Sequence, residues 1–166
     1  MACWPWMPTL SINNYLVLTH ERTIMHTTTT QLNTNTNDAG KLVLRIALAA
    51  MLLFHGVAKL SGGIGFVADM LAKAGLPAVF GYGVYIGEVV APLLILVGLC
   101  TRPAALIVAI NMIVAVLLAH TSQFFTLNET GGWALELQGM FFFAAVAVAL
   151  LGAGRYSIGG VNGRLN

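Results

Sequence analysis

Five ionisable side chains lie within or beside strongly apolar stretches of this 166-residue sequence: His55, Lys59, Glu88, His120 and Glu136. Ionisable groups are costly inside a bilayer, so they usually face a bundle interior or a cavity and pair with one another. Histidine and carboxylate are also the usual proton donors and acceptors near neutral pH. We therefore expect a pocket in which all five groups bind a polar head group such as a quinone ring, with Glu88 and His55 as the catalytic proton carriers.

The same groups have an alternative interpretation. Two histidines and a lysine facing two carboxylates can neutralise one another and act only as an ion-paired plug that specifies helix packing. The sequence leaves both interpretations open. Asn111, in the middle of another apolar stretch, is expected to form a hydrogen bond between helices.

Glu88 has a second unusual feature, because Pro92 follows it by four residues. Proline has no backbone N–H and pushes on the carbonyl four residues earlier in a helix. A carboxylate and a freed carbonyl should therefore lie together at residue 88. The alternative is a plain kink around a structural glutamate.

The elements that must position these groups are four apolar segments, at residues 41–60, 79–100, 103–120 and 133–152. Charged residues make up 8% of the chain, against about 25% in soluble domains, and about 20 apolar residues cross a bilayer core. We predict an all-α transmembrane four-helix bundle, with a short interfacial helix between the first two spans. The net charge of +2 is too small and too dispersed to indicate nucleic-acid binding.

Residues 1–38 differ from the rest of the chain because they are rich in Thr and Asn and low in complexity. We expect this segment to be disordered, and we expect residues 1–24 to be absent from a native protein that starts at Met25. Residues 39–158 form the predicted membrane domain, and residues 159–166 a cytoplasmic tail. Lysine and arginine are more numerous on the side of the termini, which the positive-inside rule places in the cytoplasm.

Sequence motifs for tightly bound cofactors are missing. The two cysteines, Cys3 and Cys100, form no CxxC pair and have no metal-ligand spacing, and no CxxCH, GxGxxG or P-loop is present. We therefore expect no metal and no tightly bound cofactor. Arg45, inside the first span, is expected either to extend its side chain to the interface or to anchor a lipid phosphate or a partner there.

Several short motifs, in this order and spacing, resemble the DoxX family of small bacterial membrane proteins over about residues 41–158. The matching residues are Arg45, Phe54-His55-Gly56, Lys59-Leu60, Gly75-Leu76-Pro77, Glu88, Gly98-Leu99, Thr101-Arg102-Pro103, His120, Phe124-Phe125, Gly131-Gly132-Trp133, Glu136 and Gly152-Ala153-Gly154-Arg155-Tyr156-Ser157. The sequence departs from the family in two places. Ile158-Gly159 stand where an acidic residue is common, and residues 1–38 match nothing in it.

The resemblance implies a four-helix bundle in the bacterial plasma (inner) membrane and a quinone-interacting subunit of a membrane oxidoreductase system. It also implies a soluble redox or sulfur-transfer partner, and a homo-oligomer is a further arrangement left open. A non-enzymatic assembly or anchoring subunit is the alternative function. A small-solute or proton transporter is a third, which a broken helix beside an acidic residue would suit.

Overall fold

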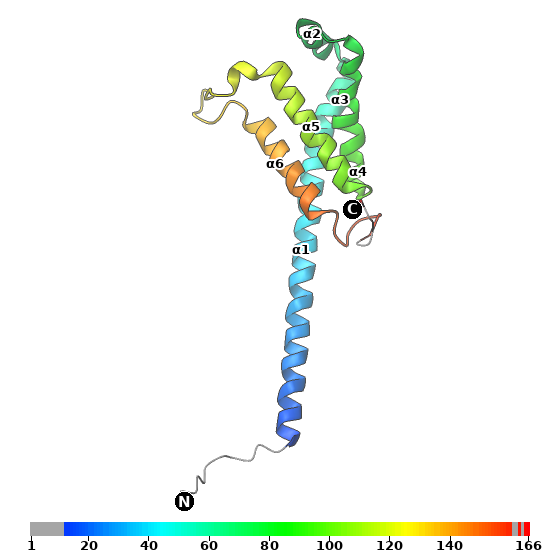
Figure 1. Cartoon of the computed structure of the whole chain (residues 1–166), viewed down its shortest axis with the longest axis vertical. Helices are drawn as coiled ribbons and strands as arrows, with labels where there is room; N and C mark the ends of the chain where they lie inside the picture. The colour runs from blue at the N-terminus through cyan, green and yellow to red at the C-terminus, as the bar shows by residue number, and fades with distance from the viewer. Residues whose placement is uncertain (1–11, 161–162, 164) are drawn as a thin grey trace, which may run out of the picture. The chain divides into compact units, whose positions relative to one another are not determined.

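The computed structural model describes the backbone of residues 12–160, 163, 165 and 166, and the side chains of residue 24 and of those from residue 34 onward within that range. These residues are helical apart from loops and one isolated bridge between Leu127 and Trp133 (Figure 1). The four main helices are α1 (Ile12–Gly62), α4 (Ala91–Val97), α5 (Thr101–Ala119) and α6 (Glu136–Leu151). The other helical segments are α2 (Gly65–Lys73), η1 (Ala78–Tyr82), α3 (Gly83–Tyr85), η2 (Ile86–Val90) and η3 (Thr121–Gln123).

The chain divides into two compact units, Met1–Asn37 and Asp38–Asn166. Helix α1 begins at Ile12, so residues 12–38 are helical where the composition predicted disorder. Extending an existing helix costs much less than nucleating one, which lets weak helix formers such as Thr and Asn continue a helix. Residues 1–11 lie outside the described residues. That residues 1–24 are not native stays a prediction.

The core of the Asp38–Asn166 unit draws side chains from α1, α4, α5 and α6. Its buried members include Leu48, Leu52, Ile95, Val108 and Phe141. Alanine is frequent among the others, and small residues let helix backbones approach closely where packing has to hold a bundle together. The predicted all-α helical bundle is therefore confirmed.

Three helical stretches are long and apolar enough to cross a membrane: Thr34–Gly62, Ala78–Val97 and Thr101–Ala119. The fourth predicted span corresponds to α6, which starts at Glu136 rather than at the predicted residue 133. It is apolar but shorter than the other three stretches. The preceding loop holds Trp133 outside the helix. Its indole N–H donates to the carbonyl of Phe124 at 2.8 Å, and its backbone forms the bridge to Leu127. Residues 133–135 therefore belong to the loop.

The second predicted span is not one regular helix. It consists of the 3₁₀ helix η1, a single turn α3, the π-helical turn η2 and then α4. The short helix expected before it is α2, which ends at Lys73 ahead of Gly75 and Pro77. Irregular backbone at this point has a local cause in Pro92, which lies in the first turn of α4.

Arg45 lies inside the bundle, not at the interface where the sequence placed it. It is only 1% exposed. Its guanidinium donates to the carbonyls of Ile95 at 3.0 Å and Leu96 at 3.2 Å, in the last turn of α4. It also donates to the carbonyls of Ala153 and Tyr156, after α6. Carbonyls in a last helical turn lack partners within the helix, and a cation there also favours the helix dipole.

Gly159 and Asn166, in the segment predicted as a cytoplasmic tail, contact the connection between α4 and α5. The amide of Gly159 donates to the carbonyl of Gly98 at 3.0 Å. The amide and hydroxyl of Thr101 both donate to Asn166 Oδ1 at 3.2 Å. Gly98 has a positive φ of 74°, and a Cβ at this position would clash with Ser157 and lie 2.9 Å from the Arg45 guanidinium. The tight turn, the tail and Arg45 therefore form one packed region.

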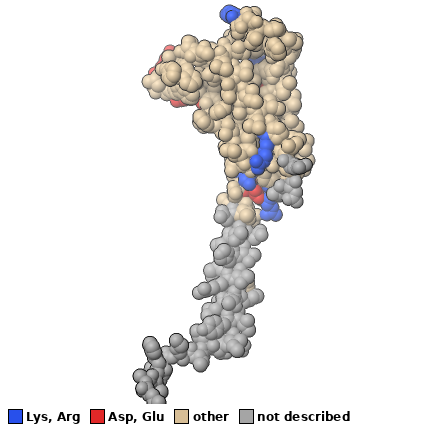
Figure 2. Space-filling model, in the orientation of Figure 1, with Lys and Arg blue, Asp and Glu red and all other residues tan. Residues whose placement is uncertain are grey.

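The outer surface of the bundle is apolar. Large hydrophobic side chains that are more than half exposed occur on α1, α5 and α6, among them Phe54, Ile110, Leu117, Phe143 and Leu150. On the face drawn in Figure 2, the Lys, Arg, Asp and Glu side chains of the Asp38–Asn166 unit gather near its ends, and a wide uncharged band lies between them. An apolar patch of this extent is typical of a membrane-facing surface.

Replacing Arg45 by Met should destabilise the protein strongly. Up to four carbonyls would lose their donor, and each unsatisfied buried polar group costs about 1–3 kcal/mol. We expect a loss of at least about 3 kcal/mol, measured by thermal or denaturant unfolding in detergent micelles. Arg102→Met is the matched control because Arg102 is exposed and its side chain makes one hydrogen bond, to the Asn166 carbonyl. Equal destabilisation by the two changes would contradict the structural role of Arg45.

Gly56→Ala should also destabilise, by about 1–3 kcal/mol, the usual cost of overpacking a tight contact. A Cβ at Gly56 would clash with the carbonyl of Glu88 and lie 2.7 Å from Val89 Cγ2. Gly62→Ala, in the same helix, is the control because nothing lies within 4 Å of its added Cβ. There, alanine's better helix propensity should keep stability equal or raise it. Unfolding of both variants in micelles makes the comparison, and an unchanged Gly56→Ala would refute this close approach of α1 and η2.

Candidate functional site

The candidate site is built around Glu88, which lies in the π-helical turn η2. The amide of Ala91 donates to the carbonyl of Ile86, five residues back, and this is the π-type register. Pro92 has no amide to donate to the Glu88 carbonyl. The wider turn accommodates that missing bond, and π-turns within helices are frequent at functional sites. The backbone around Glu88 is therefore altered at the place where the sequence predicted that Pro92 would disturb it.

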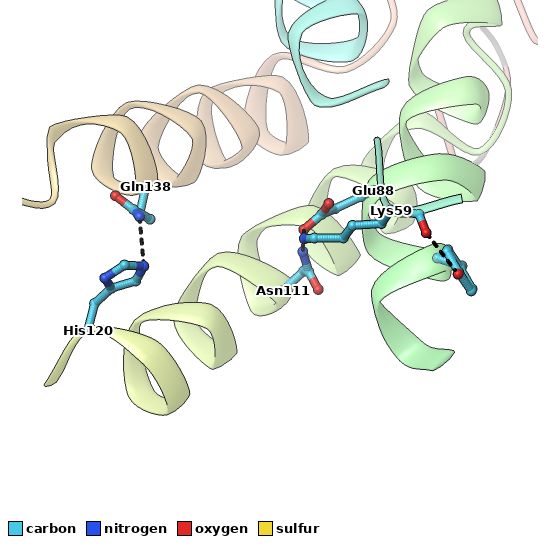
Figure 3. Close-up of polar contacts among 6 residues, drawn as sticks. Lys59, Glu88, Asn111, His120 and Gln138 are labelled. Carbon is cyan, nitrogen blue, oxygen red and sulfur yellow. Dashed lines mark hydrogen bonds and ion pairs between the residues drawn. The ribbon is translucent and has the colours of Figure 1, made fainter. Parts of the chain in front are cut away.

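The Glu88 carboxylate is buried and is held by two other helices (Figure 3). Lys59, from α1, donates to Oε1 and forms an ion pair with it. Asn111, from α5, donates to the same oxygen at the long distance of 3.5 Å. Oε2 has no hydrogen-bond partner within the described part of the chain. The carboxylate thus has one oxygen fixed by donors and one without a donor.

Glycine residues allow this arrangement. A Cβ at Gly87 would lie 2.7 Å from Asn111 Cβ, so the glycine lets the asparagine reach the η2 turn. The Tyr85 hydroxyl donates to the carbonyl of Lys59 at 3.2 Å, which ties the end of α1 to the helix that carries Glu88. Lys59, Glu88 and Asn111 therefore come from three segments that backbone packing brings together.

A cavity of about 760 Å³ adjoins these residues. It is within the range typical of small-molecule sites, about 300–1,000 Å³. Its polar lining includes His55, Lys59, Glu88, Asn111, His120 and Gln138. Most of the remaining lining is aliphatic or aromatic and comes from α2, η1, α5 and α6, including Phe66, Met70, Phe80, Ile110, Leu117 and Phe141.

His120 lies at the C-terminal end of α5 and lines the same cavity. Its Nδ1 is 2.8 Å from Gln123 Oε1, and its Nε2 is 3.2 Å from Gln138 Nε2 (Figure 3). For a neutral ring, these partners place the proton on Nδ1 and leave Nε2 as an acceptor. Rotation of the Gln138 amide would present its oxygen to a protonated ring instead. His120 can therefore keep both hydrogen bonds in either charge state.

His55 and Glu136 have different surroundings. His55 lines the cavity and packs edge-on against Phe141, with ring centroids 5.8 Å apart. Glu136 is exposed in the first turn of α6, beside Gly132, and does not line this cavity. The helix begins at Glu136 instead of residue 133, and this places the carboxylate at the loop. Four of the five residues singled out in the sequence thus share one cavity, and Glu136 lies apart from them.

Gln138 and Tyr85 were not predicted from the sequence to take part in the site. Gln138 is a polar residue near the start of an apolar segment, and this was the available signal for it. The bond from Asn111 to Glu88 confirms that Asn111 links helices. Among the residues that the structure describes, no group of three or more His, Cys, Asp and Glu side chains could hold a metal ion.

Comparison with known proteins gives one finding. The DoxX family model matches residues 40–121, which include α5 and the residues from Arg45 to His120 discussed above. Neither the curated proteins nor the solved structures contain a match to the chain. The matched segment contains Lys59, Glu88 and Asn111, whereas Glu136 lies beyond it. With its three long apolar helices, this chain is a membrane protein and belongs to the DoxX family.

Proposed function

We propose that this protein is a quinone-interacting subunit of a membrane oxidoreductase system. The observation that carries the proposal is the buried Glu88 carboxylate, which lines a largely apolar cavity and has one oxygen without a donor among the residues that the structure describes. A buried polar atom without a partner is costly in an apolar setting. A ligand with a hydroxyl and a carbonyl on a flat apolar ring would supply the missing bond and fill the cavity.

The residues present fit such a head group. Lys59 Nζ and Asn111 Nδ2 are donors that a quinone carbonyl can accept from, and Glu88 Oε2 is an acceptor for a quinol hydroxyl. When bound, a quinone supplies a two-electron, two-proton couple. Glu88 would hold a proton at Oε2, while Lys59 keeps Oε1 paired. His55, on the same cavity, would be the second proton carrier.

His120 lies at the other polar end of the same cavity, where its ring nitrogens contact Gln123 and Gln138. Glu136 supports no role in this pocket, because it does not line it. The sequence assigned no tightly bound cofactor, and the proposal needs only a quinone that exchanges with the membrane pool. The electron donor would be a soluble redox or sulfur-transfer subunit, and the protein could act within a homo-oligomer.

We further propose four spans in the bacterial inner membrane with cytoplasmic termini, α6 being the fourth. Sixteen helical residues extend about 24 Å at 1.5 Å per residue, against a hydrocarbon core of about 30 Å. A short span is accommodated by local thinning of the bilayer or by flanking residues. The excess of Lys and Arg on the side of the termini supports this orientation.

The second candidate function is a non-enzymatic assembly or anchoring subunit. The Lys59–Glu88 pair favours it, because the pair joins α1 to η2 and could serve packing alone. Removing one partner of a buried ion pair costs about 3–5 kcal/mol. Under this function, Glu88 variants would lose stability or abundance and leave no separate binding defect.

Glu88→Gln should lower binding of the reduced quinone, the quinol, by about tenfold to one hundredfold, because the hydrogen bond from a quinol hydroxyl to the charged carboxylate contributes about 1.5–3 kcal/mol. The measurement is the amount of quinone and quinol retained by protein purified gently from its native membrane, together with titration of added ubiquinol and menaquinol. Glu129→Gln is the control, since Glu129 is exposed in the loop before α6.

A double variant separates binding from folding. Lys59→Met with Glu88→Gln removes both charges, and replacing both members of a buried pair is often nearly neutral for stability. We expect this variant to unfold near the wild-type temperature and still to bind quinone poorly. Wild-type quinone binding in a stable double variant would refute the proposed site. Absence of quinone binding by the wild type would favour the assembly function.

A further inference from the structure

The exposed apolar residues of α5 form two rows that differ in one respect. Ile107, Ile110, Val114 and Leu117 are exposed and also line the cavity. Leu106 and Ile113 are exposed but do not line it. The spacings of three, four and three residues place the first row on one face of the helix. We call these four residues the α5 stripe.

A side chain that both lines a cavity and is exposed lies at an opening of that cavity. The α5 stripe runs from Ile107 to Leu117, which is about 15 Å of helix at 1.5 Å per residue. This is about half of a hydrocarbon core of about 30 Å. Because α5 is one of the helices long and apolar enough to cross a membrane, the opening faces hydrocarbon along the side of the bundle.

The polar groups of the cavity limit how a ligand can lie in it. Asn111 and His120 are nine residues apart on α5, which corresponds to about 13 Å along the helix. A single ring held at Glu88 therefore does not reach His120. At the His120 end, the contact between His120 and Gln138 bridges α5 and α6. A hydrocarbon chain attached to a head group at Glu88 would contact the apolar side chains of the α5 stripe.

We propose that the α5 stripe binds the hydrocarbon tail of a membrane-dissolved amphiphile, which enters the cavity sideways from the bilayer and places its polar head at Lys59 and Glu88. The match between one polar end and a long apolar wall carries this assignment. The identity of the head rests on the proposed function, whereas the tail groove rests on the α5 stripe. Binding should therefore depend on tail length, and the dependence should arise at α5.

The test uses Ile110→Trp, which would fill the groove, and Ile113→Trp as its matched control. Both isoleucines are exposed, by 59% and 46%, on the same helix. The probes are a long-tailed ubiquinone and its tail-less benzoquinone head group, titrated onto purified protein in micelles. We expect Ile110→Trp to weaken binding of the long-tailed probe at least tenfold and to leave the head group's affinity unchanged. Ile113→Trp should change neither affinity. Val114→Trp repeats the test if Ile110→Trp does not fold.

The other outcomes are also decisive. Unchanged long-tail binding in Ile110→Trp and Val114→Trp would overturn the groove, as would an equal effect of Ile113→Trp. If the wild type binds neither probe, the quinone head is wrong, and mass spectrometry of native amphiphiles retained by each variant then tests the groove. Their selective loss in Ile110→Trp supports the groove, and equal retention overturns it. If the wild type is a dimer and Ile110→Trp dissociates it, a second copy of the chain covers the α5 stripe, and the tail groove is overturned.

Discussion

A buried carboxylate and the lysine that pairs with it govern the arrangement of this bundle. Lys59 and Glu88 come from different helices and meet beside an apolar cavity, where a buried Glu88 charge without a partner would be costly. Their pairing requires α1 to approach η2 closely, which the glycine at position 56 permits. It also requires a turn that presents the carboxylate inward, which the π-helical backbone before Pro92 provides. Gly56 and the π-helical turn before Pro92 are unrelated as sequence features, yet both allow the Lys59–Glu88 ion pair to form.

The same requirement extends to backbone groups. In an apolar environment, every carbonyl without a partner is costly, and carbonyls in the last turn of a helix such as α4 and in the segment after α6 need donors from outside a helical ladder. Arg45 satisfies four of them from within the core, where its charge is spread over backbone dipoles instead of being paired with a carboxylate. A long cationic side chain in a span is therefore not always directed to the membrane surface. Here it fastens two chain segments that are distant in sequence.

The cavity combines two kinds of surface that suit an amphiphile. One region carries donors and an acceptor without a partner, and the rest is hydrocarbon with an exposed edge along α5. Under the proposed function, such a site would discriminate by polarity: a wholly apolar lipid chain would leave Glu88 unsatisfied, and a small polar solute would leave the apolar wall empty. The two polar ends of the cavity differ as well, since His120 contacts two glutamines, whereas Glu88 is held at one oxygen by Lys59 and Asn111.

The sequence by itself determined the class of fold and most of the polar inventory. Long apolar runs predicted the helices, Pro92 after Glu88 predicted the altered backbone, and the mid-span Asn111 predicted a bond between helices, because each depends on local composition or spacing. Only the tertiary structure decided which groups meet. Whether Arg45 faces lipid or carbonyls, and whether Glu136 joins the cavity, depends on helix rotation and on the residue where α6 begins. These are set by packing between segments far apart in the chain, and no local pattern records them.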